Sequence, residues 1–215
     1  MRKSKISAIC FDMWGTLYEG GGSEEWVDLQ QNLGALSVEK KTFYKLGLDN
    51  LLLRSWPLRD GIRHLAYALN LKINNETVEK VYKSWWQIVK NSKPYPETIE
   101  VLKKVKRMNL RLIIISNTDS ESFYFKIKEY NLKKYFEKFF ISAEIGSLKH
   151  EGKMFELAQD YLSVPKNQVL MLDDSLQHGV IPARNFGWQA LWLAREKAGK
   201  DRYWIENLKR IFDFL

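Results

Sequence analysis

Short, almost wholly apolar segments recur along the chain and predict β-strands that are buried on both faces. The first covers residues 6–11 and is too short to be a typical buried helix. Strands that are covered on both faces are typical of parallel sheets, which helices flank. The other predicted strands are 112–115, 169–172 and 190–193, with a weaker one at 139–141.

Between these strands lie segments in which apolar residues recur at helical spacing. Strands that alternate with helices predict an α/β protein, with a parallel sheet and helices on both of its faces. The expected helices are 98–108, 121–130, 153–162 and 179–186, and a further amphipathic helix is expected over residues 201–215.

The alternation fails between Tyr18 and Tyr95, where no segment resembles a buried strand. Three glycines at 20–22 open this stretch and a proline-containing segment at 92–96 closes it. Both indicate hinges, because glycine is flexible and proline interrupts helix and sheet. We therefore predict a core of residues 1–17 and 96–215 and a helical insert of residues 18–95. Its expected helices are 23–33, 38–53, 58–69 and 75–89.

The composition of the 215-residue chain, with 45% hydrophobic residues, suits one domain or one core with a smaller insert. Cys10 is the only cysteine, which excludes an intramolecular disulfide and fits a reducing compartment. Asp12 interrupts the apolar run near the N-terminus, so a signal peptide is a poor interpretation. No segment approaches the ~18 apolar residues of a membrane span. These features predict a cytoplasmic protein with no membrane partner.

A formal net charge of +8 could attract nucleic acid or phosphorylated metabolites. The basic residues are scattered in pairs over predicted helical faces, which favours a solvated surface over a nucleic-acid interface. His64, His150 and His178 are the only histidines and are scattered as well. We expect them to be surface or structural residues.

Polar residues follow the predicted strands, at the places where ligands of open parallel sheets bind. A carboxylate at such a place can attack phosphorus or activated carbon, and neighbouring acids can hold Mg²⁺. A hydroxyl group and a lysine ammonium can hold the transferring oxygens. The strand ends and the loops after them supply Asp12, Thr16, Ser116, Asn117, Lys149, Asp173 and Asp174.

Four motifs, in this order, resemble those of the haloacid dehalogenase (HAD) superfamily. FDMWGTL resembles the first motif, a hydrophobic residue before Asp-x-x-Gly-Thr-Leu, and LIIISNT resembles the second, an apolar strand ending in Ser or Thr. Lys149 and Phe155 have the six-residue spacing of the third, and VLMLDDS resembles the fourth, a strand ending in acids. The resemblance spans residues 6–193. It implies a Rossmann-like core with a helical cap that closes over the site and selects the substrate.

The resemblance also implies roles for the residues at the strand ends. Asp12 would be the nucleophile, and Thr16 and Ser116 would orient it and bind phosphoryl oxygens. Lys149 would neutralise charge and, with Ser116 and Asn117, contact the substrate. The implied reaction is hydrolysis of a small phosphorylated metabolite through an aspartyl-phosphate intermediate.

A magnesium site is implied by the same resemblance. Asp12, Asp174 and the backbone carbonyl of Trp14 would hold Mg²⁺ directly, and Asp173 would take part through water or another ligand. The usual motif also has an acid five residues after Asp174, where this chain has Gly179.

Trp14 departs from the first motif, because most phosphatases of the superfamily have a second Asp there as general acid. Such acid catalysis is typically worth about 10²–10⁴-fold, and an indole cannot supply it at neutral pH. Dehalogenase relatives have an aromatic Tyr at this position, so a metal-independent 2-haloacid dehalogenase is one alternative. Against it, the adjacent Asp173 and Asp174 favour a bound cation. Another alternative is a weakly active HAD-fold protein with a binding or regulatory role.

The third motif leaves two lysines as candidates for the charge-neutralising role. Lys153 lies about one helical turn beyond Lys149 and could share that role. The spacing to Phe155 favours Lys149.

Overall fold

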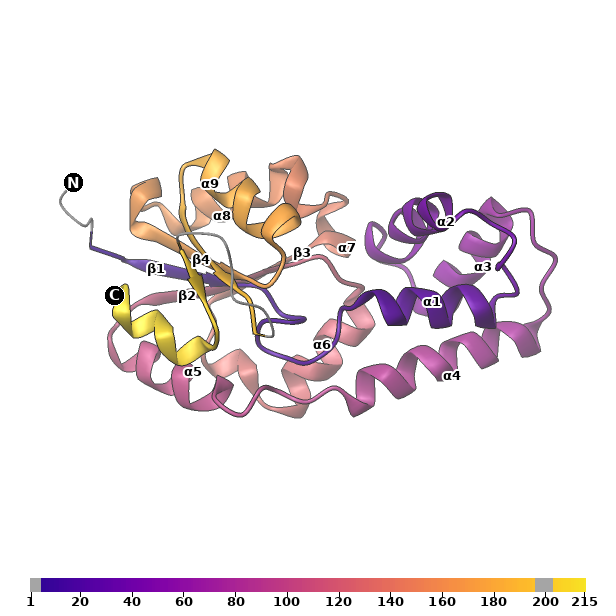
Figure 1. Ribbon diagram of the computed structural model, residues 1–215, viewed down its shortest axis with the longest axis horizontal. Coiled ribbons are helices and arrows are strands. Elements are labelled where there is room, and N and C mark those ends of the chain that lie inside the picture. Colours follow the sequence, from indigo (N-terminus) through magenta and orange to yellow (C-terminus); the bar gives the residue numbers. More distant parts are fainter. Residues whose placement is uncertain (1–4, 196–202) are drawn as a thin grey trace.

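A six-stranded parallel sheet forms the centre of the computed structural model, which describes residues 5–195 and 203–215 (Figure 1). The strand order is β3-β2-β1-β4-β5-β6, which confirms the predicted α/β fold. All five predicted strands are present, with bounds within two residues of those expected. The strands are β1 (Ala8–Phe11), β2 (Arg111–Ser116), β3 (Lys138–Ile141), β4 (Val169–Asp173), β5 (Gln189–Leu193) and β6 (Trp204–Ile205).

Helices follow each of the strands β1 to β4, and after β1 the four helices of the insert come first. The first four are α1 (Ser23–Asn32), α2 (Lys40–Gly47), α3 (Leu58–Ala68) and α4 (Asn75–Asn91). The others are α5 (Thr98–Arg107), α6 (Ser120–Glu129), α7 (Ser142–Ile145), α8 (Lys153–Leu162) and α9 (Ile181–Phe186). Single π-helical turns, Leu48–Leu52 and Leu176–Val180, adjoin α2 and α9, and 3-10 turns occupy Leu132–Lys134, Lys149–Glu151 and Lys166–Gln168. In the described part of the chain, no helix has the length and apolar character needed to cross a membrane.

Alternate residues of the strands point to opposite faces of the sheet and build two hydrophobic cores. Ile9 and Phe11 of β1 belong to the core that α5 and α6 cover. Ala8 and Cys10 belong to the core that α8 and α9 cover. Figure 1 shows these two helical layers on either side of the sheet. Because both faces are covered, the middle residues of the strands are apolar, which is why the strands were recognisable in the sequence.

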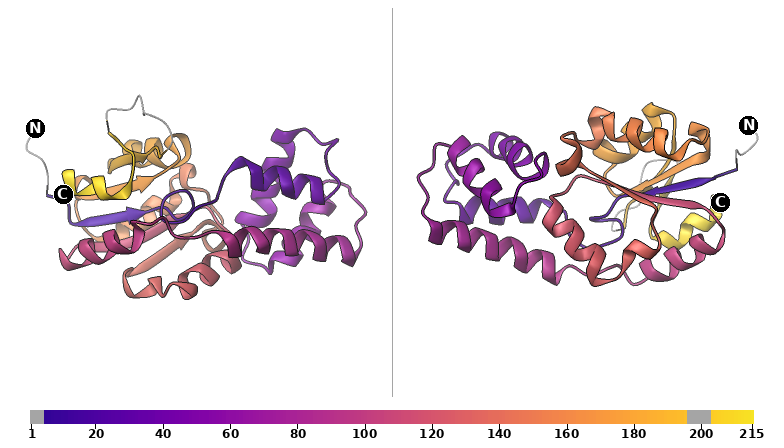
Figure 2. Two further views of the ribbon diagram at one scale, coloured as in Figure 1. Left: turned by 60° about the horizontal axis from the view of Figure 1, so that its bottom comes forward. Right: turned by 180° about the vertical axis from the view of Figure 1, so that it is seen from behind.

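The helical insert, α1–α4, has a hydrophobic core of its own. Leu29, Phe43, Leu65 and Val81, one from each helix, are all buried in it. The insert lies beyond the carboxyl ends of the strands and outside both helical layers (Figures 1 and 2). Its division from the core at residues 18 and 95, and its role as a cap, remain predictions.

Two backbone linkers join the insert to the core, and they are hydrogen-bonded to each other. The N–H of Glu19 donates to the carbonyl oxygen of Lys93 (2.9 Å), and the Ser92 hydroxyl donates to the carbonyl oxygen of Glu19 (2.6 Å). Lys126 of α6 is fully buried beside them, and its ammonium donates to the Ser92 carbonyl oxygen (2.7 Å) and to the Glu129 carboxylate (2.7 Å). A core helix thus holds the end of the insert.

The single helix predicted over residues 201–215 is wrong. Residues 201 and 202 lie outside the described part of the chain, Trp204–Ile205 forms strand β6 at the sheet edge, and a 3-10 helix, Leu208–Asp213, follows. A two-residue strand is too short to show a period-two pattern, so the helical spacing after it dominated the interpretation. Leu208 and Ile211 are buried in the core that α5 covers.

Glu97, at the start of α5, links this C-terminal segment to the core and should make stability depend on pH. Its carboxylate accepts hydrogen bonds from Arg195 (2.7 Å) and from the N–H of Leu208 (3.3 Å). Burial alone would raise the pKa of Glu97, but these partners outweigh it and lower the pKa below 4.5. The stabilising contribution of Glu97 to the free energy of unfolding is therefore complete above about pH 5. It is lost as the pH falls through the pKa of Glu97 in the folded state. Urea unfolding should show Glu97→Gln less stable than wild type by up to about 2 kcal/mol at pH 6, with a smaller difference at pH ~3.

Glu100→Gln is the matched control for this experiment. Glu100 lies in the same helix and forms ion pairs with Lys104 and Lys209, but all three side chains are about half exposed. Exposed pairs contribute little, so this variant should stay close to wild type at both pH values. A stability difference for Glu97→Gln that does not change with pH would contradict the assignment.

Candidate active site

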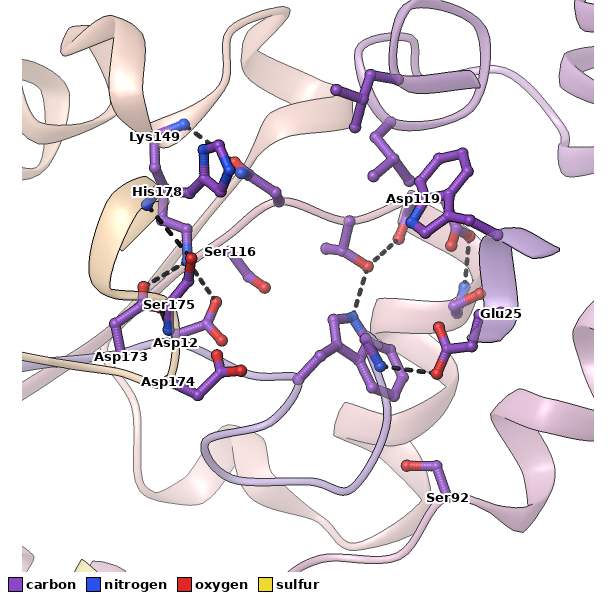
Figure 3. A pocket seen from close by; sticks show the side chains of 18 of the residues that line it. Asp12, Glu25, Ser92, Ser116, Asp119, Lys149, Asp173, Asp174, Ser175 and His178 are labelled. Atoms are coloured by element: carbon purple, nitrogen blue, oxygen red, sulfur yellow. Dashed lines mark hydrogen bonds and ion pairs between the residues drawn. The ribbon is translucent and has the colours of Figure 1, made fainter. Parts of the chain in front are cut away.

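The carboxyl ends of β1, β2 and β4 meet at one point because these strands are neighbours in the sheet. Asp12 directly follows β1, Ser116 ends β2 and Asp173 ends β4. The N–H of Asp12 donates to the carbonyl oxygen of Leu172 (2.9 Å), so the parallel ladder continues up to the site. Residues that are far apart in the sequence therefore face one pocket, as Figure 3 shows.

Lys149 lies between two of these carboxylates. Its ammonium donates to Asp12 Oδ1 (2.8 Å) and to Asp173 Oδ2 (2.5 Å), and its side chain is only 4% exposed. Burial alone would lower the pKa of this lysine, but the two carboxylates outweigh burial and raise the pKa above its ordinary value. Lys149 is thus a cation throughout the physiological pH range. Lys153, the other candidate, is exposed and donates to the carbonyl oxygen of Ile145 (3.2 Å).

Asp12, Asp173 and Asp174 form a cluster in which one oxygen from each lies within 4.8 Å of the others. Burial and the neighbouring carboxylates raise the pKa values of Asp173 and Asp174 above their usual range, although Lys149 opposes this effect. One ammonium does not balance three carboxylates, so the cluster holds excess negative charge when they are ionised. Carboxylate oxygens are the ligands that Mg²⁺ prefers.

Two glycines give these carboxylates their space. A Cβ at Gly15, whose φ is +73°, would overlap the carboxylate of Asp174, and a Cβ at Gly179 would overlap the carboxylate of Asp173. The N–H of Ser175 also donates to Asp173 (2.8 Å). Asp173 therefore fills the space beside residue 179, the position where the fourth motif usually carries its second acid.

Gly179→Ala should reduce turnover by about 100-fold, because the new methyl group would push Asp173 away from Lys149. The backbone at Gly179 does not have a positive φ, so the substitution adds no backbone strain there. The measurement is kcat/KM together with the thermal midpoint. Gly22→Ala is the matched control, since a Cβ at Gly22 would meet no atom within 4 Å and its φ is not positive. Full activity in Gly179→Ala would show that the position of Asp173 is unimportant.

The predicted hydroxyl and amide residues have different surroundings. Thr16 Oγ1 accepts the N–H of Asp174 (3.1 Å), and Asn117 Oδ1 accepts the N–H of Lys149 (3.0 Å). These two side chains position other members of the site. Ser116 Oγ is buried and has no hydrogen-bond partner among the described residues. Because Ser116 also lines the pocket, its hydroxyl is available to a bound substrate.

A cavity of about 500 Å³ lies between this cluster and the insert. The sheet contributes the carboxylates, Lys149 and Ser116 to its lining. The insert contributes mainly apolar and aromatic side chains, among them Trp26, Tyr44, Leu48, Leu52, Trp85 and Ile88. The cavity therefore has a charged end at the strands and an apolar wall on the insert.

Trp14 forms part of the wall beside the cluster. Its indole N–H donates to the Thr118 hydroxyl (3.0 Å), so its one donor is already engaged within the protein. Trp14 therefore does not replace the missing general acid. Its ring lines the same cavity as Asp12.

Three further residues of the lining are charged or titratable, and the motif pattern did not indicate them: Glu25, Asp119 and His178. Two sequence features could have indicated them: Glu25 comes shortly after the glycine run, and Asp119 follows the second motif. Trp85 of the insert also lines the cavity and donates to Ser122 Oγ (3.0 Å).

The chain matches the family model of haloacid dehalogenase-like hydrolases over residues 6–187. This span contains the carboxylate cluster, Lys149 and Ser116. The chain therefore belongs to the haloacid dehalogenase-like hydrolases.

Similar proteins include both dehalogenases and phosphatases. The (S)-2-haloacid dehalogenase of Pseudomonas sp. (strain YL) is 23% identical, over 97% of this chain and 94% of its own length. The phosphoserine phosphatase of Thermus thermophilus is 29% identical, over 47% of this chain and 41% of its own. The crystal structure of a HAD phosphatase from Thermococcus onnurineus has a TM-score of 0.66 and 22% identity, covering 97% of each chain. This structural likeness confirms the fold.

Proposed function

We propose that this hydrolase is a Mg²⁺-dependent phosphatase that acts on a small phosphorylated metabolite. The observation that carries the proposal is the cluster of Asp12, Asp173 and Asp174 around a single ammonium. An anionic substrate would be repelled by an ionised cluster of this kind, and a divalent cation removes the repulsion. Displacement of a halide from carbon transfers no phosphoryl group, so it makes no use of a cation that would bind phosphoryl oxygens.

The donor set fits Mg²⁺, because all of its members are oxygen atoms. Gly15 has no Cβ and so leaves room for the Asp174 carboxylate at this place. Asp12, Asp174 and the backbone carbonyl of Trp14 would hold the ion, with Asp173 kept in place by Lys149 and Ser175. When bound, Mg²⁺ supplies charge neutralisation at the phosphoryl oxygens.

In this proposal Asp12 attacks phosphorus, a bond forms between its carboxylate oxygen and phosphorus, and the bond to the leaving oxygen breaks. Lys149 offsets the negative charge, and the unpartnered Ser116 hydroxyl donates to a phosphoryl oxygen. Water then attacks phosphorus, which releases phosphate and restores Asp12. Since Trp14 donates no proton, the reaction requires a leaving group of low pKa, such as a phenol or the acid of an acyl phosphate.

The two parts of the chain would divide this work. Residues 1–17 and 96–215 would carry out the chemistry, and the insert of residues 18–95 would act as the cap that covers the substrate. The insert's apolar contribution to the cavity wall supports this division.

A 2-haloacid dehalogenase is the second candidate, favoured by the dehalogenase relative that matches 97% of the chain and by Trp14. In that reaction Asp12 would attack carbon and displace a halide ion, which leaves without a proton. The absence of a general acid would then need no compensation.

Parallel assays with and without EDTA distinguish the two. We expect Mg²⁺-dependent release of 4-nitrophenol from 4-nitrophenyl phosphate, whose leaving group tolerates a missing acid, and no chloride release from 2-chloropropionate. Chloride release that persists in EDTA, with no phosphatase activity, would establish the dehalogenase instead.

A further inference from the structure

The end of the cavity away from the catalytic cluster has an unusual lining: two carboxylates and no basic side chain. Figure 3 shows Glu25 and Asp119 across the pocket from Asp12, Asp173 and Asp174. Among the described lining residues, the only basic side chains are Lys149 and His178, and both lie on the side of the cluster. The far end therefore repels any negatively charged part of a substrate.

Glu25 is held in this position by the glycine run before α1. Its Oε1 accepts the N–H of Gly21 (2.7 Å), and a Cβ at Gly20 would lie 2.9 Å from the same oxygen. No lysine or arginine in the described part of the chain forms an ion pair with it within 4.0 Å. Burial raises the pKa of Glu25 above its ordinary value, as expected for a carboxylate without a cation.

Asp119 reaches the same end from the core. It is 5% exposed, it is the N-cap of α6, and its Oδ1 accepts the N–H of Ser122 (2.8 Å). Trp85 of the insert donates to the Ser122 hydroxyl, so insert and core close this end together. In the described part of the chain, Asp119, like Glu25, forms no ion pair with a lysine or arginine.

Aromatic rings contribute much of the cavity lining. The rings of Trp26 and Tyr44 meet edge to face with centroids 4.8 Å apart, and those of Trp26 and Trp85 do so at 6.3 Å. Trp14 lines the same cavity, so a ligand bound there meets several aromatic faces. Aromatic faces beside carboxylates attract a cation and favour a neutral aromatic group, but they offer no partner to an anion.

On the basis of the proposed phosphatase function, we infer that the substrate is a phosphate ester of a phenol that carries an amine at its far end. The phosphoryl group lies at Asp12, the ring lies between the tryptophans, and the ammonium lies at Glu25 and Asp119. Esters whose far end carries a carboxylate or a second phosphate are disfavoured by the same two residues.

Three matched esters test this inference: 4-(aminomethyl)phenyl, 4-methylphenyl and 4-(carboxymethyl)phenyl phosphate. We expect kcat/KM to fall in that order, with the amine preferred over the carboxylate by at least about tenfold. Glu25→Gln keeps an acceptor for Gly21 but removes the charge, so it should reduce this ratio by at least about threefold. Glu24→Gln, an exposed neighbour in the same helix turn, should leave the ratio unchanged.

A second measurement covers the case in which Glu25→Gln does not fold. Raising the salt concentration from about 0.05 M to about 0.5 M should shrink the wild-type ratio, because the discrimination is electrostatic. If 4-methylphenyl phosphate is hydrolysed and the two charged esters react at equal rates, or the carboxylate ester reacts faster, the inferred substrate class is wrong. The phosphatase proposal would still hold. No phosphate release from any ester, 4-nitrophenyl phosphate included, overturns the phosphatase proposal as well.

Discussion

Asp12→Asn should abolish turnover while leaving the fold intact. Asp12 is the nucleophile in both proposed reactions and an amide is a poor one, so kcat should fall by at least about four orders of magnitude. The substitution also removes one of three clustered negative charges, and Lys149 keeps its bond to Asp173. We therefore expect an unchanged or slightly higher Tm, as is common when a functional group is removed from a strained site. The readouts are product release and a thermal melt.

The control for this variant is Asp160→Asn, an exposed aspartate in α8. It should retain wild-type activity. Because both candidate reactions use Asp12, the result separates an enzyme from a HAD-fold protein with only a binding or regulatory role. Equal activity of wild type and Asp12→Asn would contradict both enzymatic proposals.

Lys149→Met should damage activity and stability together. Its ammonium is the cation between Asp12 and Asp173, so the variant leaves two buried carboxylates without their partner. Removing one member of a buried ion pair typically costs about 3–5 kcal/mol. For a chain of this length that corresponds to a fall in Tm of roughly 6–20 °C. Activity should fall by at least about 100-fold, since the proposed mechanism uses this ammonium to offset negative charge in the transition state.

Lys153→Met separates this effect from a general loss of a lysine in the third motif. Lys153 is exposed and does not reach the carboxylates, so its replacement should change Tm by no more than about 1 °C. If Lys149→Met lost less activity and less thermal stability than Lys153→Met, the assignment of the two lysines would be reversed.

The sequence predicted the arrangement of β1, β2 and β4 because each is covered on both faces and therefore consistently apolar. It also predicted that Asp12, Ser116 and Asp173 would meet, since parallel strands end at the same edge. It did not predict β6, whose two residues are too few to show a period, nor α7, which is a single helical turn.

The far end of the cavity was less accessible to sequence reasoning. Glu25 and Asp119 come from separate elements, and their proximity to the aromatic wall depends on how the insert packs on the core. The sequence also did not indicate what occupies the space beside Gly179. In the sequence it appears as a missing acid, whereas in space the carboxylate of Asp173 occupies that volume.

The paired linkers at Glu19 and Lys93 restrict how the insert can move. The insert is held to α6 as well, because the N–H of Leu58 donates to the Glu121 carboxylate (2.7 Å) and Trp85 donates to Ser122 (3.0 Å). Opening of the pocket therefore has a cost in hydrogen bonds on the α6 side, and the closed arrangement is the one that these bonds favour.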